Sequence, residues 1–225
     1  MAIAFDAATS SDSITPFNHT PVGTPKGVLV LVCGADDTSL STLTAVTYGI
    51  ASLTEVSGSP NTKTTGRDYR VWAFFLGTSV PTGTQSVALV GTITAAGYQA
   101  VCITYTATGD TAVEGVNTSI NSDSSANPSS TLTIANESHI SIGFSSGQGA
   151  VTGITPLTGW TSIAETDQGL DVTGVYRKDA NASSNTTVGW TQTAEDALAI
   201  AVAVREAAGA ATSFLLRRQR MGVGM

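Results

Sequence analysis

The segment "TAEDALAIAVAVREAAG" (193–209) decides the fold class, because its residues are compatible with a helix and with a strand. Its many alanines, its early acidic residues, Arg205 near the end and Gly209 after it favour a helix. Its alternation favours a strand, since large aliphatic side chains and alanines fall on opposite faces. The large ones are Leu198, Ile200, Val202 and Val204, and the small ones are Ala197, Ala199, Ala201 and Ala203. We predict a strand whose alanine face packs closely against another sheet or chain.

The same period of two recurs along the chain and predicts further strands. In "HISIGF" (139–144) apolar residues alternate with polar or small ones, so we predict a strand buried on one face. The runs "GVLVLVC" (27–33) and "VWAFFLG" (71–77) are apolar on both faces, which predicts central strands covered on both sides. Turn clusters rich in Gly, Pro, Ser and Asn separate the runs at a spacing typical of a β-sandwich.

These patterns predict an all-β protein, a single-domain antiparallel β-sandwich over residues 25–208. We expect two packed sheets and no helix longer than about two turns. A length of 225 residues suits one large all-β domain, and no linker within residues 1–208 separates two cores. We assign residues 1–24 to an N-terminal strand or arm and residues 209–225 to a short basic C-terminal arm.

Composition and charge argue against several partners. The chain is 41% hydrophobic and only 12% charged, with a net charge of −7, so its body has no basic footprint for nucleic acid. The start "MAIAFDAATSSDS" (1–13) has neither the basic nor the apolar region of a signal peptide. No apolar run reaches the roughly 18 residues of a membrane span. We therefore expect synthesis in a cytoplasm, with neither nucleic acid nor a membrane as partner.

The residues that bind metals are too few and too scattered for a metal site. Cys33 and Cys102 lie in separate apolar runs without a Cys-x-x-Cys motif, so we expect two buried free thiols. His19 and His139 are isolated and do not complete a zinc shell. Asp123 is the only carboxylate of its polar loop, which favours a solvated turn over a calcium site. We expect neither a metal nor a cofactor.

One catalytic motif needs consideration. "GFSSG" (143–147) matches the G-x-S-x-G nucleophile elbow, with Ser145 as the nucleophile. The elbow requires a strand that turns into a helix and a histidine after the serine, but "GQGAVTGITP" (147–156) is glycine-rich and both histidines precede Ser145. A glycosidase needs two carboxylates across a cleft, and the sequence places no such pair. We therefore expect no enzymatic activity and assign no catalytic residues.

The three tryptophans are the candidates for binding sugars. Trp72 lies in an apolar run and is expected in the core. Trp160 and Trp190 lie in the similar stretches "GWTSIAE" (159–165) and "GWTQTAE" (189–195), which we interpret as neighbouring strands in similar environments, since two copies do not make a repeat protein. Packing in the core or at its rim is favoured for both, and stacking on a glycan ring is the alternative.

The C-terminal stretch "SFLLRRQRMGVGM" (213–225) combines apolar and basic residues, whereas all 17 acidic residues precede it. We predict an extended arm that buries its apolar side chains in a groove of a neighbouring subunit or partner and sets its arginines against carboxylates there. The predicted partner-binding residues are Phe214, Leu215, Leu216, Arg217, Arg218 and Arg220. A solvated tail and a weak, salt-sensitive contact with nucleic acid are the alternatives.

Three stretches carry a resemblance to a known family. They are "VWAFFLGTSVPTGTQSVAL" (71–89), "SGQGAVTGITPLTGWTSIAETDQGLDVTGVY" (146–176) and "TAEDALAIAVAVREAA" (193–208). The chain resembles a family of uncharacterised tailed-phage proteins over about residues 25–208, through a strand ending in FLG, a Pro-Thr-Gly turn and a Trp after PLTG. The resemblance implies a concanavalin-like jelly roll from a phage virion and offers no catalytic residues.

Taken with the resemblance, the residues indicate a virion structural protein without enzymatic activity. Its simplest form is a capsid decoration protein or a head- or tail-attached accessory protein. We expect it on the virion, after synthesis in the host cytoplasm, as a homo-oligomer or bound to other virion proteins. The alternative is a lectin-like module that binds glycans of the host surface.

Overall fold

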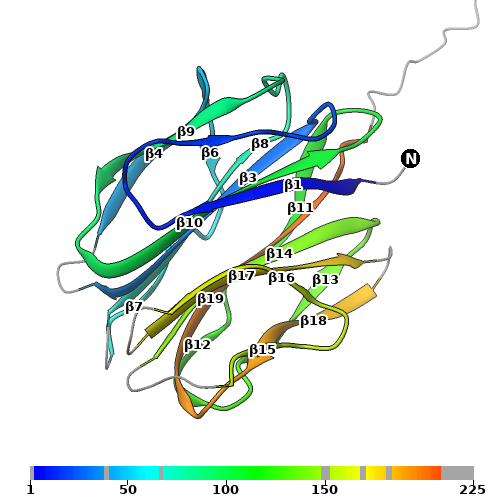
Figure 1. Cartoon of the computed structure of the whole chain (residues 1–225). Coiled ribbons are helices and arrows are strands. Elements are labelled where there is room, and N and C mark those ends of the chain that lie inside the picture. Colours follow the sequence, from blue (N-terminus) through cyan, green and yellow to red (C-terminus); the bar gives the residue numbers. More distant parts are fainter. Residues whose placement is uncertain are drawn as a thin grey trace, which may run out of the picture.

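The protein is all-β, as its sequence predicts. The computed structural model describes residues 3–37, 41–65, 68–147, 153–167, 171–180 and 184–208 (Figure 1). Within these ranges the chain forms strands and turns and no helix. The ambiguous segment near the C-terminus is strand β19 (Glu195–Glu206), so the strand prediction is confirmed. Accordingly, none of the described residues forms a helix that is long and apolar enough to cross a membrane.

The first half of the chain forms two antiparallel sheets, which we call sheets A and B. Sheet A has the strand order β1-β10-β3-β8-β6, with β7 also paired to β8, and sheet B has the order β2-β9-β4-β5. The strands of sheet A are β1 (Ala4–Ser11), β3 (Gly27–Asp37), β6 (Thr54–Glu55), β7 (Asn61–Lys63), β8 (Tyr69–Leu76) and β10 (Ala95–Thr106). Those of sheet B are β2 (Phe17–His19), β4 (Thr42–Tyr48), β5 (Ala51–Ser52) and β9 (Gln85–Thr92).

The second half forms two further antiparallel sheets, C and D. Sheet C has the order β11-β19-β14-β17-β16, with β12 also paired to β19, and sheet D has the order β13-β18-β15. The other strands of sheet C are β11 (Thr111–Asn117), β12 (Asn121–Ser125), β14 (Ser138–Gly147), β16 (Thr161–Asp167) and β17 (Asp171–Ala180). Those of sheet D are β13 (Ser129–Ile134), β15 (Thr155–Pro156) and β18 (Ser184–Thr191).

The two halves repeat one topology. In sheet A the last strand of its half, β10, lies between β1 and β3, and in sheet C the last strand, β19, lies between β11 and β14. The outer sheets correspond as well, with β2-β9-β4 in one and β13-β18-β15 in the other. Each half follows the strand order of a jelly roll, in which alternate strands enter opposite sheets. The predicted number of two sheets was therefore wrong, because the described residues pass through this order twice and form four.

The four sheets stack in the order B, A, C, D, so that sheets A and C face each other in the middle (Figure 1). The A–C core contains Leu29, Leu31, Val101 and Ile103 opposite Val175, Leu198, Ile200, Val202 and Val204. The A–B core contains Val28, Val30, Val32, Trp72 and Phe74 with Val46, Tyr48 and Val87. The C–D core contains Ile140, Ile142, Phe144 and Ala197, Ala199, Ala201 and Ala203 with Leu132, Ile134, Val188 and Trp190.

Stacking in four layers explains the strands that are apolar on both faces. Successive residues of a strand point to opposite faces, so those of β3 and β8 enter the A–B and A–C cores in turn. The prediction of central strands at 27–33 and 71–77 is confirmed. On β19 the large aliphatic side chains enter the A–C core, and the alanines let sheet D approach closely, as predicted.

The strand predicted at 139–144 is buried on both faces rather than on one. All ten residues of β14 are buried, because sheet D covers its isoleucines and sheet A covers the face with small and polar side chains. On that face the Ser141 hydroxyl lies 3.1 Å from the Tyr105 hydroxyl. A Cβ atom on Gly143 would lie 3.0 Å from Cys33 Sγ, so glycine permits the close approach of the two halves.

Candidate functional site

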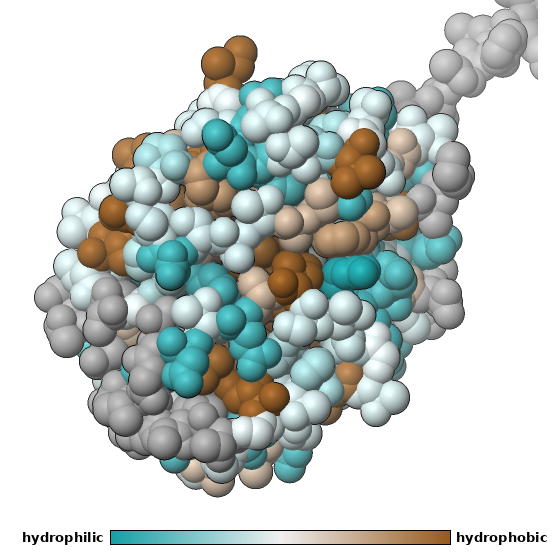
Figure 2. Space-filling model, in the orientation of Figure 1, coloured by the Kyte–Doolittle hydropathy of each residue, from teal (hydrophilic) through white to brown (hydrophobic). Residues whose placement is uncertain are grey.

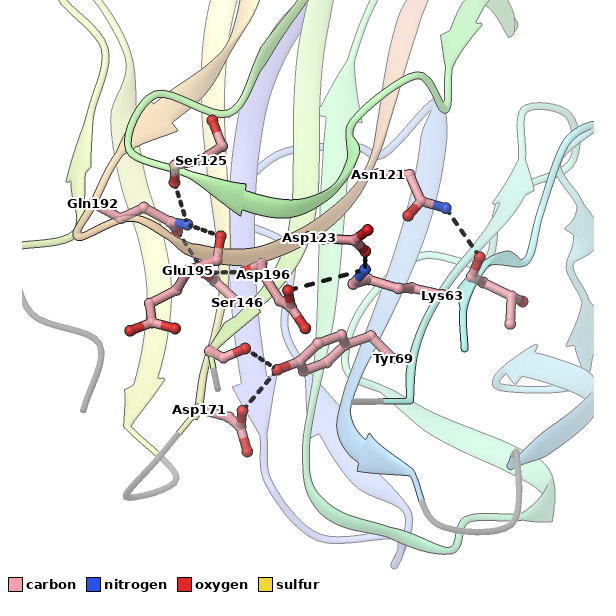
Figure 3. Close-up of polar contacts among 12 residues, drawn as sticks. Lys63, Tyr69, Asn121, Asp123, Ser125, Ser146, Asp171, Gln192, Glu195 and Asp196 are labelled. Atoms are coloured by element: carbon pink, nitrogen blue, oxygen red, sulfur yellow. Dashed lines mark hydrogen bonds and ion pairs between the residues drawn. The ribbon is translucent and has the colours of Figure 1, made fainter. Parts of the chain in front are cut away.

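A cluster of polar side chains, most of them buried, lies at one end of the interface between the two halves (Figure 3). Lys63 on β7 and Tyr69 on β8 come from the first half, and Asp123 on β12, Asp171 on β17 and Asp196 on β19 come from the second. Lys63, Asp171 and Asp196 expose only 2%, 3% and 1% of their surface. Ionisable side chains are rarely buried without partners, so the hydrogen bonds and ion pairs of these side chains are described in turn.

Lys63 is held between two carboxylates. Its ammonium forms an ion pair with Oδ1 of Asp123 and lies 4.0 Å from Oδ1 of Asp196 (Figure 3). The Asp123 side chain is 72% exposed, whereas Asp196 is buried with the lysine. Removing an ammonium group from water costs several kcal/mol, and two nearby carboxylates offset much of that cost.

Backbone pairing fixes these groups in place. In sheet A, Lys63 is the partner of Tyr69 in the β7–β8 ladder. The preceding Asn61 donates its side-chain amide across the interface to the carbonyl oxygens of Thr118 and Ala199, at 3.0 and 2.7 Å. In return the side-chain amide of Asn121 donates to the carbonyl of Thr62 at 3.2 Å. Strand β7 is thereby tied to the second half, and Lys63 is presented to its carboxylates.

Tyr69 makes a second link between the halves. Its hydroxyl is 2.9 Å from Oδ1 of Asp171 and also contacts the carbonyl oxygen of Gly147 (Figure 3). The tyrosine is fully buried, and Asp171 is nearly so. A hydrogen bond to a buried carboxylate is stronger than one between neutral groups, so this contact fixes how the sheets align.

Gln192 extends the network toward sheet D. Its Oε1 lies 2.5 Å from both Ser146 Oγ and Trp190 Nε1, and its Nε2 donates to the carbonyls of Ser125 and Glu195 at 2.9 and 3.1 Å. The amide is therefore satisfied at both ends. The cluster ties together three of the four layers.

His139 is a further buried ionisable group at the central interface. Its Nδ1 lies 2.6 Å from Oδ1 of Asp179, and its ring packs against the rings of Phe5 and Tyr105. Burial lowers the pKa of His139, and the hydrogen bond from the imidazole lowers the pKa of Asp179. Both shifts in pKa agree with a neutral imidazole that donates a hydrogen bond from Nδ1 to the ionised Asp179. Its Nε2 has no hydrogen-bond partner among the described residues.

His19 and the two cysteines are also buried, and burial shifts the pKa of each. His19 lies between two hydroxyls, with Nδ1 2.9 Å from Thr9 Oγ1 and Nε2 3.1 Å from Thr104 Oγ1, and burial lowers its pKa. Cys33 and Cys102 are buried free thiols, as predicted. Burial raises the pKa of Cys33 to about 12 and also raises that of Cys102, so neither thiol ionises near neutral pH.

The nucleophile-elbow motif forms part of a strand. Ser145 lies near the end of β14, is fully buried, and donates its hydroxyl to the carbonyl oxygen of Gly34 at 3.1 Å. The motif therefore does not present the serine on a turn between a strand and a helix. The hydroxyl instead forms a link between sheets C and A.

The tryptophans lie where core packing predicts. Trp72 is buried, and Trp190 is fully buried with its ring stacked on Phe144 at a centroid distance of 4.4 Å. Stacking of Trp190 on a glycan is thus wrong, because its faces are already covered. Trp160 is 7% exposed, donates from Nε1 to the carbonyl of Thr187 at 3.2 Å and lines a surface hollow.

That hollow has a volume of about 530 Å³. Trp160, Lys178, Asp179, Asn185 and Thr187 are among the side chains that line it. On the face seen in Figure 2, hydrophilic and neutral residues predominate, and strongly hydrophobic ones form small separate groups. The large apolar side chains that the structure exposes are likewise scattered: Ile14, Val22, Ile50 and Val90.

The cluster around Lys63 is not evident from the sequence. The polar residues around Asp123 predict a solvated turn, but residues 121–125 form β12 and Asp123 pairs with the lysine. Lys63, Asp123 and Asp196 are far apart in the chain, and no local motif links them. The predicted arm residues Phe214, Leu215, Leu216, Arg217, Arg218 and Arg220 lie outside the described residues.

Among the residues that the structure describes, no three or more His, Cys, Asp and Glu side chains are arranged to hold a metal ion. In comparisons with known proteins, no family model, curated protein or solved structure matches the chain.

Proposed function

We propose that this protein is a structural component of a phage virion without enzymatic activity, most simply a capsid decoration protein or a head- or tail-attached accessory protein. The observation that carries the proposal is that polar side chains which could do chemistry face the interior of the protein. Lys63, Tyr69 and Ser145 are turned inward, where they link the two halves, and the ring of His139 packs across the same interface against Phe5 and Tyr105. A four-layer body tied in this way is suited to a rigid building block.

Two features of the sequence support a place on a particle. The resemblance to tailed-phage proteins extends over about residues 25–208, which include all strands except β1 and β2. The C-terminal stretch adds three arginines and three large apolar residues to an otherwise acidic chain. Apolar side chains that insert into a groove, flanked by charges that meet carboxylates, are a common way to attach one protein to another. The arm is therefore the proposed means of attachment to sibling subunits or other virion proteins.

Deletion of residues 213–225 tests this function. We expect the truncated protein to keep its circular dichroism spectrum and melting temperature but to lose assembly or attachment to particles, as measured by electron microscopy and by quantitative mass spectrometry of purified particles. The matched control replaces the three arginines with lysines and should retain most of the attachment. Attachment of the truncated protein at wild-type occupancy contradicts the role of the arm, and absence of the full-length protein from purified particles contradicts the virion proposal.

A glycan-binding module for host attachment is the second candidate, and the hollow beside Trp160 favours it. Sugar sites combine an aromatic edge with polar side chains that form hydrogen bonds, and Lys178, Asn185 and Thr187 line this hollow. A glycan array probed with the full chain tests the candidate. Binding that is lost in Asn185→Ala and kept in Lys26→Ala, at a separate hollow, supports it. An array without any signal above background contradicts it.

A further inference from the structure

The cluster around Lys63 brings together the three groups that are needed to form an amide bond within the chain. Lys63 supplies an amine, Asp123 supplies a carboxylate in contact with it, and Asp196 supplies a second carboxylate 4.0 Å from the same nitrogen (Figure 3). The three side chains come from β7, β12 and β19. Lys63 is paired with Tyr69, and Asp123 lies where the register between β12 and β19 shifts. Both the amine and the second carboxylate are buried.

This arrangement favours condensation over a simple ion pair in two physical respects. Holding two reacting groups in contact replaces a bimolecular encounter by an intramolecular one, with an effective concentration far above that of the free groups. Burial of Lys63 and Asp196 keeps bulk water away from the reacting nitrogen, which disfavours hydrolysis of the amide once it has formed. A neighbouring carboxylate that accepts and returns a proton completes the requirements.

We propose that Lys63 and Asp123 become joined by an intramolecular amide bond, with Asp196 as the proton-transfer group. Asp196 accepts one proton from the Lys63 ammonium, and the freed amine attacks Cγ of Asp123. A C–N bond forms, and one Cγ–O bond breaks. The departing oxygen takes the second proton of the nitrogen and the proton held by Asp196, and it leaves as water. One ammonium and one carboxylate thus give one amide and one water molecule, and Asp196 ends as it began.

The chemistry of the side chains explains why the Lys63–Asp123 ion pair is the one proposed to react. Arg205 and Glu114 also form an ion pair, at 2.5 Å, but a guanidinium group remains protonated and does not act as a nucleophile. The bond between Lys63 and Asp123 connects the first half of the chain to the second. It closes a covalent loop across the central interface, which limits how far the two halves can separate when the sheets unfold.

The intact mass of the full-length protein, measured under denaturing conditions, tests the proposal. We expect a mass lower than that of the sequence by one water molecule, and digestion should release a branched peptide that joins the segments around Lys63 and Asp123. Lys63→Arg keeps the positive charge but should have the full mass of its sequence. Asp196→Asn keeps the shape of the side chain but should remain uncondensed when the wild type has reacted completely.

A further variant identifies the leaving group. In Asp123→Asn the side-chain nitrogen departs in place of oxygen, so the chain should lose one ammonia instead of one water. Circular dichroism confirms that each variant is folded. An unmodified mass for the folded wild-type protein overturns the proposal. Loss of water that persists in Lys63→Arg also overturns it, because that result indicates a cyclic imide at an aspartate.

Discussion

The central interface and the outer interfaces of this molecule are built from different chemistry. The A–B and C–D cores are filled with aromatic and aliphatic side chains, including Trp72 and Trp190. The A–C interface also has an apolar core, but buried hydrogen bonds and an ion pair surround it, from Ser141, Tyr69 and Lys63 among others. Apolar packing stabilises an interface but depends little on the relative orientation of the two sheets. Buried hydrogen bonds form in only a few relative orientations of the sheets. The outer interfaces therefore stabilise each sandwich, and the central one determines how the two sandwiches stack.

The largest effect is expected in an outer interface. Trp190→Ala removes a fully buried ring stacked on Phe144 and should lower the free energy of unfolding by about 3–5 kcal/mol. Chemical denaturation followed by far-ultraviolet circular dichroism measures the loss. Ile50→Ala, at a fully exposed turn, is the control and should change stability by less than about 0.5 kcal/mol. Equal losses in the two variants contradict the assigned role of the C–D core.

A smaller loss is expected where the two halves approach most closely. A side chain on Gly143 meets Cys33 and Leu31 of sheet A, so Gly143→Val should cost about 1–3 kcal/mol through overpacking. Hydrogen exchange should show the largest change in the strands of sheets A and C. Gly109→Val is the control, because a Cβ there meets nothing closer than Glu206 at 3.4 Å. Greater loss of protection in sheets B and D than in A and C would break the comparison.

A hydroxyl that links the halves should matter less. Ser145→Ala removes one hydrogen bond, to the carbonyl of Gly34, and should lower the free energy of unfolding by about 1 kcal/mol. Ser10→Ala, at an exposed position of an edge strand, serves as the control. Thermal denaturation of the two variants measures the difference. If Ser145→Ala leaves the melting temperature unchanged, the central interface tolerates the loss of a polar contact. That outcome weakens the proposed role of polar contacts in aligning the two halves.

Acid should weaken the central interface gradually. The pKa of His139 is lowered in the folded state, so the unfolded chain binds more protons as pH falls below 6.5, and stability decreases in that range. Asp179 adds a loss at lower pH, because its folded pKa lies below 3.8 and its contribution disappears as pH falls through that value. Melting temperatures from pH 8 to 4 should fall less steeply in His139→Gln. A steeper fall in that variant contradicts the assignment.

Local patterns predict the strands but not the way in which they stack. The alternation in 193–209 correctly separates the faces of β19, and the doubly apolar runs correctly identify β3 and β8. The polar face of β14 appears solvent-facing in the sequence, because serine and glycine occur both at surfaces and where two sheets approach closely. The repeated topology is also hidden, since corresponding strands share positions but not residues. Pairing of Lys63 with Asp123 joins groups far apart in the chain, which no local period reveals.

The position of β19 in the sheet has a consequence for synthesis on the ribosome. Sheets A and B contain only residues that precede 107, so they can form while the rest of the chain is still being made. The Val71 and Ala73 side chains of β8 then lack part of their cover until the last strand arrives, because β19 contacts β8 and contributes Leu198, Ile200 and Val202 to the same core. β19 also lies in the middle of sheet C, between β11 and β14. A nascent chain released before residue 206 therefore lacks both the cover of its first half and the centre of its second, and it becomes a substrate for chaperones and proteases.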